Sequence, residues 1–312
     1  MSKTAVIAIG GNSLIRAGEK GLIDEQRVNA RRTADAIVDI VQDGYSVALT
    51  HGNGPQVGAA LLRSERSAGQ VYRHPLDVCV ATTQGEIGYV LQQSLTEAMA
   101  AAGLEASVAT ILTQVVVSAD DPAMAAPSKP VGPFMSQREA EARRDEEGWH
   151  IVEDAARGWR RVVASPVPLE IVEERVICDL IRRGMLVVAL GGGGIPVVRE
   201  DGRLRGVAAV IDKDRASSLL ATRLRVHQLI ISTDTDRIYL DFKTPRQRAL
   251  EYVSAAQLRA HYEAGHFPPG NMGPKVEAAL SFLEHGGREV IITRYEQLVD
   301  AVHDRAGTHI LP

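Results

Sequence analysis

Three lysines of this chain stand in short segments that are rich in glycine, proline and aspartate. They are Lys129 in SKPVGP, Lys213 in VIDKDRAS and Lys275 in PPGNMGPK. Arginine is otherwise the usual cation, because only six of the 35 basic residues are lysine. A compact ammonium can follow a phosphoryl group as it moves, which a planar guanidinium does less well. The three positions therefore indicate chemistry on phosphate groups.

Glycine-rich turns follow three apolar segments that have the character of β-strands. These segments and their turns are AVIAIGGN (5–12), SVALTHGNGPQVG (46–58) and MLVVALGGGG (185–194). Glycine lets an anion approach backbone N–H groups, and a helix that starts at the turn adds the positive end of its dipole. Three such turns predict a crevice at the carboxyl edge of a parallel sheet, where open α/β folds bind phosphorylated ligands.

The first two turns also contain asparagine, whose side-chain amide donates to oxygen without adding charge. Their residues are Gly10, Gly11 and Asn12 after the first segment, and Gly52 and Asn53 after the second. We expect these two turns to form one small-anion site.

The third turn includes Gly192 and Gly193. We expect it to contribute to a nucleotide site and to let two lobes of the chain approach closely beside Lys213. None of the turns matches the GxxxxGK[ST] pattern of P-loop enzymes or the GxGxxG pattern of dinucleotide-binding folds. The sequence therefore argues against both classes.

Aspartates accompany the lysines. Asp212 and Asp214 stand before an apolar helical segment, where carboxylates can hold a lysine or a Mg²⁺ ion. Asp234 follows the predicted strand LIIS, and Tyr239 comes shortly after it. Acidic and hydroxyl groups at the end of a strand suit a nucleotide ribose or a metal, and an aromatic ring can flank a base.

Other kinds of active site have little support. No Ser/His/Asp order and no metal-ligand spacing stand out, and the two cysteines, Cys79 and Cys178, are about a hundred residues apart. Amides, lysines and aspartates suit phosphoryl transfer, which depends on positioning and on neutralising charge.

Strands and helices alternate along most of the chain. The predicted strands are 4–9, 46–50, 106–112, 186–190, 227–232, 237–241 and 288–292. The predicted helices are 25–43, 55–67, 77–102, 136–147, 169–183, 214–225, 254–264, 273–285 and 295–302. A hairpin that turns at Asp201-Gly202 is expected after the third glycine turn.

This alternation predicts an α/β sandwich in two lobes. The boundary falls near 206–212, which gives an N-terminal lobe of residues 1–206 and a C-terminal lobe of residues 207–312. Residues 115–165 interrupt the alternation and are rich in proline, glycine and charge. An insertion of this size is typical of a lid that faces the substrate.

Composition narrows the class of protein further. The chain has 312 residues, is 45% hydrophobic and carries a net charge of -4, so a basic field for nucleic acid is not expected. The apolar runs are too short to span a membrane, and the N-terminus has no signal-peptide pattern. We expect a cytoplasmic protein with neither nucleic acid nor membrane as partner.

The ordered motifs resemble those of the carbamate kinases, within the amino acid kinase family. The motifs are AIGGN, THGNGPQVG, PLDVCVATTQGEIGY, LTQVVV, KPVGPF, ARGWRRVVASPVP, GGGGIPV, VIDKD and AGHFPPGNMGPKVEAA. The resemblance extends from about residue 4 to residue 293. It implies a three-layer α/β/α sandwich with a mainly parallel open sheet and a protruding insertion subdomain. It also implies a homodimer that reversibly transfers a phosphoryl group between carbamoyl phosphate and ADP, giving carbamate and MgATP.

The resemblance also implies roles for the candidate residues. The first two glycine turns would hold carbamoyl phosphate, and Lys129 would reach over it from the lid. Lys213 would stabilise the phosphoryl group in transit, with Asp212 and Asp214 orienting that lysine or assisting Mg²⁺. The nucleotide phosphates would meet Lys275, and the adenosine would meet Asp234 and Tyr239.

Two other functions agree with the same motifs. One is a kinase of this fold that phosphorylates another small carboxylate, although the short polar turns offer little to recognise a larger acceptor. The other is a non-catalytic protein that binds a metabolite and regulates a partner. The presence of all three motif lysines favours an enzyme.

Overall fold

One eight-stranded sheet forms the centre of the molecule. The computed structural model describes residues 3–16, 18–154, 158–267 and 272–312, without the side chains of Asn12, Pro133 and Asp154. The strand order of the sheet is β15-β17-β16-β12-β1-β2-β9-β3, and its neighbours are parallel except β16 and β17. The strands are β1 (Lys3–Ile9), β2 (Tyr45–His51), β3 (Val108–Thr110), β9 (Leu186–Ala189), β12 (Gln228–Thr233), β15 (Tyr252–Ser254), β16 (Glu289–Arg294) and β17 (Thr308–Leu311).

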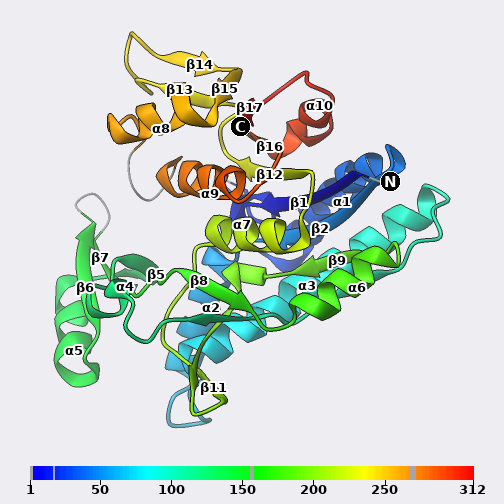
Figure 1. Cartoon of the computed structure of the whole chain (residues 1–312). Helices are drawn as coiled ribbons and strands as arrows, with labels where there is room; N and C mark the ends of the chain where they lie inside the picture. Colours follow the sequence, from blue (N-terminus) through cyan, green and yellow to red (C-terminus); the bar gives the residue numbers. More distant parts are fainter. Residues whose placement is uncertain (1–2, 17, 155–157, 268–271) are drawn as a thin grey trace.

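Helices cover both faces of this sheet, so the strands are apolar on both sides. Along β1, Val6 belongs to one buried cluster while Ile7 and Ile9 belong to the other. The first face is covered by α6 (Glu174–Arg182), α7 (Lys213–Leu224), α8 (Ala255–Glu263) and α9 (Met272–Glu284). The second is covered by α1 (Ile23–Gln42), α3 (Leu76–Ala101) and α10 (Leu298–Val302). Figure 1 shows the resulting layers, which confirm the expected α/β/α sandwich.

A second, four-stranded sheet lies against the first face and has the order β11-β10-β4-β8. Its strands are β4 (Gln114–Val117), β8 (Pro168–Ile171), β10 (Ile195–Glu200) and β11 (Arg203–Gly206). The predicted hairpin is confirmed, because β10 pairs with β11 around Asp201 and Gly202, whose φ angles are 49° and 75°.

The prediction of one helix over 169–183 is wrong at its start. Residues 168–171 form β8, which pairs with β4 and places Ile171 opposite Val115. The helix α6 begins only at Glu174. The apolar spacing of this segment fits a helix as well as a strand, and pairing with a distant strand decides the outcome.

A three-stranded antiparallel sheet and a helix project from the main body (Figure 1). The elements are β5 (Lys129–Met135), β6 (His150–Asp154), β7 (Gly158–Val163) and α5 (Gln137–Glu147), and α4 (Pro122–Ala125) precedes them. The subdomain meets α2 (Gly54–Arg66) where a Cβ on Gly58 would lie 3.2 Å from Cα of Gly132. That contact places the beginning of β5, with Lys129, beside the second glycine turn.

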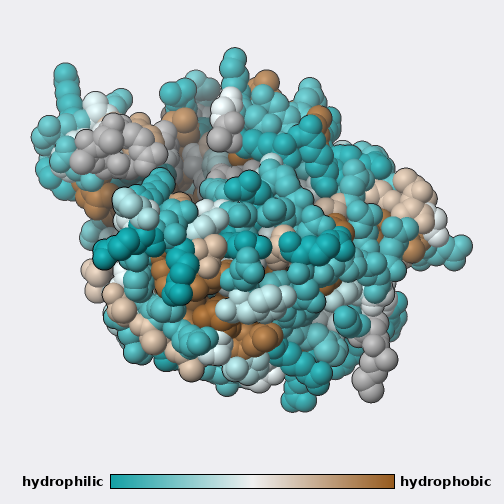
Figure 2. Space-filling view, turned by 90° about the horizontal axis from the view of Figure 1, so that it is seen from above, coloured by the Kyte–Doolittle hydropathy of each residue, from teal (hydrophilic) through white to brown (hydrophobic). Residues whose placement is uncertain are grey.

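The remaining elements are short strands and 3-10 helices. They are β13 (Ile238–Leu240), β14 (Arg248–Leu250) and the short 3-10 helices Gly11–Ser13, Gly191–Gly193 and Tyr295–Gln297. Seen from above, the surface is mostly hydrophilic, with apolar areas between the hydrophilic ones (Figure 2). Within the described ranges, no helix combines the length and apolar character needed to cross a membrane.

Candidate active site

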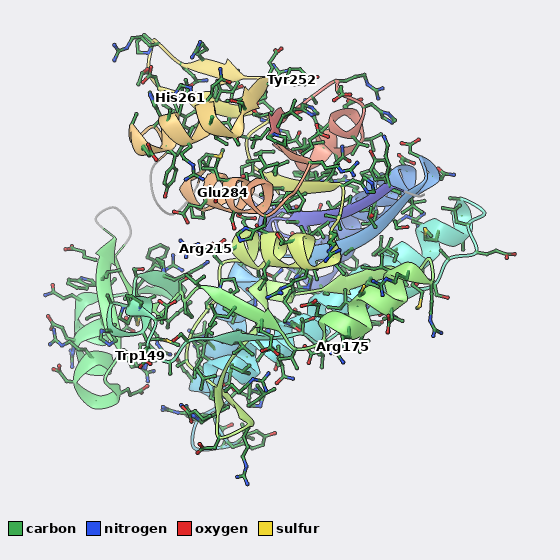
Figure 3. All side chains as sticks on the ribbon, viewed as in Figure 1. Trp149, Arg175, Arg215, Tyr252, His261 and Glu284 are labelled. Carbon is green, nitrogen blue, oxygen red and sulfur yellow. The ribbon has the colours of Figure 1, made fainter. Side chains whose placement is uncertain are left out.

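A cavity of about 200 Å³ opens where two glycine turns meet β5 and the first turns of α7 and α9. Eight residues singled out from the sequence line it: Gly52, Asn53, Lys129, Gly192, Asp212, Lys213, Asp214 and Lys275. In Figure 3, Arg215 at the start of α7 lies on the side of the main body that faces the projecting subdomain, which carries Trp149. The cavity therefore lies between that subdomain and the main body.

Two aspartates pair with the three lysines around this cavity. Nζ of Lys129 lies 2.9 Å from Oδ2 of Asp212. Asp214 bridges the other two lysines, with Nζ of Lys213 2.5 Å from Oδ1 and Nζ of Lys275 3.2 Å from Oδ2. When all five groups are ionised, three ammonium groups outweigh two carboxylates. An entering phosphate therefore meets an excess of positive charge.

Asp212 is also the N-cap residue of α7. Its Oδ1 accepts hydrogen bonds from the backbone N–H groups of Asp214, at 2.9 Å, and Arg215, at 3.4 Å. Burial alone would raise the pKa of this carboxyl group, but the charge and hydrogen bond of Lys129, with the charge of Lys213, lower the pKa to about 2. Asp212 is thus ionised at neutral pH and fixes both Lys129 and the start of α7.

The Lys213 ammonium is held in poorly hydrated surroundings. Its side chain is 14% exposed, and that of Asp214 is 4% exposed. Burial lowers the pKa of Lys213, Asp214 opposes this effect, and the charge of Lys275 adds to it. A positive charge in such a place stabilises a phosphoryl group in transit more strongly than it would in water.

The glycine turns approach each other so closely that side chains would not fit between them. A Cβ on Gly52 would lie 2.8 Å from the backbone nitrogen of Gly11, so the first and second turns are in contact. A Cβ on Gly192 would lie 2.2 Å from Nδ2 of Asn53, so the second and third turns are also in contact. The need for glycine here is one of close approach, which L side chains would prevent.

The third turn also lies against the segment that precedes Lys213. A Cβ on Gly193 would lie 2.5 Å from the carbonyl oxygen of Ile211, two residues before Lys213. Gly10 precedes the 3-10 helix of the first turn, and the side chain of Asn12 lies outside the described part of the structure. Gly10 and Gly11 lie close to Gly52 but do not line the cavity.

The residues predicted to meet adenosine lie apart from this cavity. Tyr239 lines a second cavity of about 60 Å³, together with Phe242 and Met272. The ring centroids of Tyr239 and Phe242 are 5.9 Å apart, and the Tyr239 hydroxyl donates to Asp236 at 3.0 Å. Asp234 follows β12, outside the linings of both cavities. Residues 268–271 of the Lys275 motif lie outside the described residues.

Three buried polar side chains next to the site were not assigned a role from the sequence. His51, Thr83 and Gln84 are each at most 1% exposed. Nδ1 of His51 lies 3.0 Å from the carbonyl oxygen of Gly52, and burial lowers the pKa of the imidazole to about 4, so the ring is neutral. Thr83 and Gln84 are polar residues on a buried side of α3, and that break in an apolar pattern is the signal that sequence reasoning could have used.

The carboxylates do not fit a Mg²⁺ ion held by the protein in this arrangement. Both oxygens of Asp214 face lysine ammonium groups, and Asp212 faces Lys129 and two backbone N–H groups. A cation at either carboxylate would lie beside like charges. The predicted role of Asp214 as a ligand would require Lys213 and Lys275 to move away from it.

Comparison with known proteins agrees with this geometry. Residues 3–294 match the sequence profile of the amino acid kinase family. The carbamate kinase of Thermococcus kodakarensis is 46% identical over 99% of both chains. The carbamate kinase from Giardia lamblia bound to AMP-PNP superposes with a TM-score of 0.94, at 45% identity, over 99% of this chain and 98% of that one. This chain belongs to the carbamate kinases of the amino acid kinase family.

The chain is also similar to a protein that is named carbamate kinase-like. Carbamate kinase-like protein YahI of Escherichia coli is 45% identical over 100% of this chain and 99% of its own length. The expected amino acid kinase fold is confirmed, and an ATP:carbamate phosphotransferase is the enzyme class of the family.

Proposed function

We propose that this protein transfers a phosphoryl group reversibly between carbamoyl phosphate and ADP, giving carbamate and ATP. The observation that carries the proposal is the cavity in which Lys129, Lys213 and Lys275 converge on two glycine turns. The cavity is small, about 200 Å³, which suits a compact substrate better than a large carboxylate acceptor. Relatives that are named carbamate kinases, and share nearly the whole length, support the same reaction.

Each side of the cavity takes a part in this reaction. The N-terminal lobe, residues 1–206, would bind carbamoyl phosphate at Gly52 and Asn53 of the second turn. Gly10, Gly11 and Asn12 of the adjacent first turn would complete this site. The C-terminal lobe, residues 207–312, would bind the nucleotide, with Lys275 at its phosphates. The third turn, which belongs to the N-terminal lobe, would also contact these phosphates. Lys213 lies between the two and would neutralise the charge of the phosphoryl group as it passes.

The projecting subdomain, within residues 115–165, would act as a lid. It carries Lys129, whose ion pair with Asp212 joins the lid to the start of α7. Closing the lid over a bound substrate would exclude water and bring the ammonium to the phosphate.

The nucleotide would carry the metal. Because the aspartates already face ammonium groups, we place Mg²⁺ on the phosphate oxygens of ADP or ATP, where this ion commonly binds. When bound there, Mg²⁺ would neutralise phosphate charge. Adenosine would lie toward Tyr239, and the AMP-PNP bound to the relative from Giardia lamblia supports a nucleotide site in this fold.

We further propose a cytoplasmic homodimer. Tyr89 and Leu112, 58% and 54% exposed, line a surface hollow beside the edge strand β3 and would be covered by a second copy of the chain. Light scattering from purified protein measures this state directly.

A coupled assay for ATP formed from carbamoyl phosphate and Mg-ADP tests the reaction. We expect wild-type turnover well above the uncatalysed background. The substitution Lys213→Ala should lower kcat by about 10²- to 10³-fold, as for loss of a group that stabilises charge in the transition state. Lys20→Ala, at an exposed position, is the matched control. No ATP from folded wild-type protein would exclude the reaction, and a fully active Lys213→Ala would exclude the role of this lysine.

A further inference from the structure

Two neighbouring residues of α3 hold two different glycine turns of the site. Thr83 contacts Asn53 of the second turn, and Gln84 contacts Gly191 of the third turn. Successive side chains on a helix point about 100° apart, so one short stretch of α3 can reach both turns. Both side chains are on the buried side of this helix, among mostly apolar neighbours.

The contact of Thr83 fixes the orientation of the Asn53 carboxamide. The Thr83 hydroxyl donates its only hydrogen to the carbonyl oxygen of Val80 at 2.7 Å. Its oxygen can therefore only accept from Asn53, and Nδ2 of Asn53 lies 2.8 Å away. The carboxamide must turn its NH₂ group, and not its oxygen, toward α3. Gly192 lies close to the same carboxamide, because a Cβ at this position would be 2.2 Å from Nδ2 of Asn53.

The contacts of Gln84 fix the third turn. Nε2 of Gln84 donates to the carbonyl oxygens of Gly191, at 2.9 Å, and Thr113, at 3.1 Å, while Oε1 accepts from the Thr113 N–H at 2.8 Å. The Thr113 hydroxyl in turn accepts from the N–H of Leu190, whose φ is 54°. This network holds the unfavourable backbone that starts the third turn.

We propose that Thr83 and Gln84 are positioning residues that set the spacing of the second and third turns for phosphoryl transfer. Neither lines the cavity, so both act through Asn53 and Gly191. The proposal rests on the proposed function, in which Asn53 holds carbamoyl phosphate. Loss of the Thr83 acceptor should therefore affect carbamoyl phosphate and leave ADP binding unchanged.

The experiment compares three conservative substitutions on the same helix. Thr83→Val keeps the shape of the side chain and removes the acceptor, which should lower kcat/KM for carbamoyl phosphate roughly 5- to 100-fold, as for a buried donor left unpaired. KM for ADP should stay at its wild-type value. Thr83→Ser should restore most of the activity. Thr82→Val removes a hydroxyl from the adjacent, exposed position, where it donates to Val78, and should have wild-type kinetics.

Side-chain amide resonances of Asn53 give a readout that does not depend on activity. In wild type and Thr83→Ser the Asn53 NH₂ signals should be distinct and slow to exchange with water, and in Thr83→Val they should exchange faster. Wild-type kinetics together with unchanged Asn53 signals in Thr83→Val would overturn the proposal. So would equal losses for carbamoyl phosphate and ADP, since a general structural defect would produce them. An inactive wild type would overturn the proposed reaction alone, because the Asn53 signals still test the contact.

Discussion

Asp214 places one buried carboxylate between two lysine ammonium groups. Lys213 and Lys275 come from separate helices, α7 and α9, and each would repel the other without it. The charge of Lys275 already adds to the lowering of the Lys213 pKa by burial. Asp214, together with the charge of Asp212, therefore opposes the lowering of the Lys213 pKa.

The activity of the enzyme should decrease as the pH rises and Lys213 loses its proton. In Asp214→Asn this decrease should occur at a lower pH than in wild type. Without the carboxylate, the pKa of Lys213 drops further, so the ammonium is lost at a lower pH than in wild type. The unpaired lysines should also destabilise the fold by about 3 kcal/mol, because a buried pair is broken. The pH dependence of kcat and urea unfolding measure the two effects.

Asp145→Asn provides the control for this variant, since Asp145 pairs with Arg144 at the exposed surface of the projecting subdomain. It should match wild type in both measurements. If the pH profile of Asp214→Asn overlays that of wild type, Asp214 does not set the charge of Lys213.

At the scale of residues, the sequence predicted which side chains belong to the site but not which lysine pairs with which aspartate. The motif lysines, Asp212 and Asp214 all reach one cavity, because each stands at or near the start of a strand or a helix. The pairing of Asp214 with Lys275 joins residues from distant segments, and no spacing rule predicts it. The contacts of Thr83 and Gln84 could not be predicted for the same reason, since their partners, Asn53 and Gly191, are distant in the sequence.

Among the elements, β5 links the projecting subdomain to the site. It carries Lys129 at its first residue and meets α2 at Gly132, so a shift of the subdomain moves the lysine relative to the second glycine turn. The ion pair of Lys129 with Asp212 joins this strand to the cap of α7. The lid would thus contact both the side of the cavity that binds carbamoyl phosphate and the side that binds the nucleotide.

Removal of the lid lysine should mainly weaken the handling of carbamoyl phosphate. For Lys129→Ala we expect KM for carbamoyl phosphate to rise about tenfold or more, the loss typical of a charged hydrogen bond, with KM for ADP little changed. Lys129→Arg should recover only part of the loss, because a guanidinium cannot replace a compact ammonium. Steady-state kinetics with each substrate varied separately provides the measurement.

Arg138→Ala, an exposed position on α5, should behave as wild type in the same kinetics. An effect of Lys129→Ala that is confined to ADP would argue against the lid.

Elements with strong local signals were predicted well, and those that depend on pairing were not. The long helices α1 and α3 and the strand β1 match their predicted ranges closely, since their apolar periodicity is continuous. The strands β8 and β17 are only four residues each and exist because β4 and β16 pair with them. Short strands of this kind have too few residues to show a clear alternation of apolar and polar positions, so the sequence pattern does not predict them.

At the scale of the whole molecule, an ion pair joins β17 to its neighbour β16 in the central sheet. Nδ1 of His309 lies 2.7 Å from Oε1 of Glu289 on β16, and Nε2 lies 3.1 Å from the carbonyl oxygen of Ala306. Asp304 also faces Nδ1, at 3.5 Å, and Tyr252 of β15 stacks on the ring. Because both ring nitrogens face acceptors, the charged imidazolium fits this place better than the neutral ring.

This pair should make the stability of the whole fold depend on pH. The hydrogen bond to Glu289 raises the pKa of His309 above 6.5 against the effect of burial. Burial opposes the shift of Glu289, but hydrogen bonds from His309 and Gln228 lower its pKa below 4.5. The His309 contribution is complete below pH 6.5 and is lost as the pH rises through the raised pKa, while that of Glu289 is complete above pH 4.5 and is lost in acid.

The substitution His309→Gln should therefore destabilise the protein most between pH 4.5 and 6.5. Thermal unfolding across pH measures the difference from wild type, with about 2 to 4 °C expected for each kcal/mol lost. The gap should narrow at alkaline pH, where the wild-type imidazole is neutral and the pair loses its charge. His150→Gln, at an exposed position, is the matched control. A gap that stays constant from pH 5 to pH 9 would show that His309 acts by packing alone, because His309 is the member of the pair that loses its charge as the pH rises.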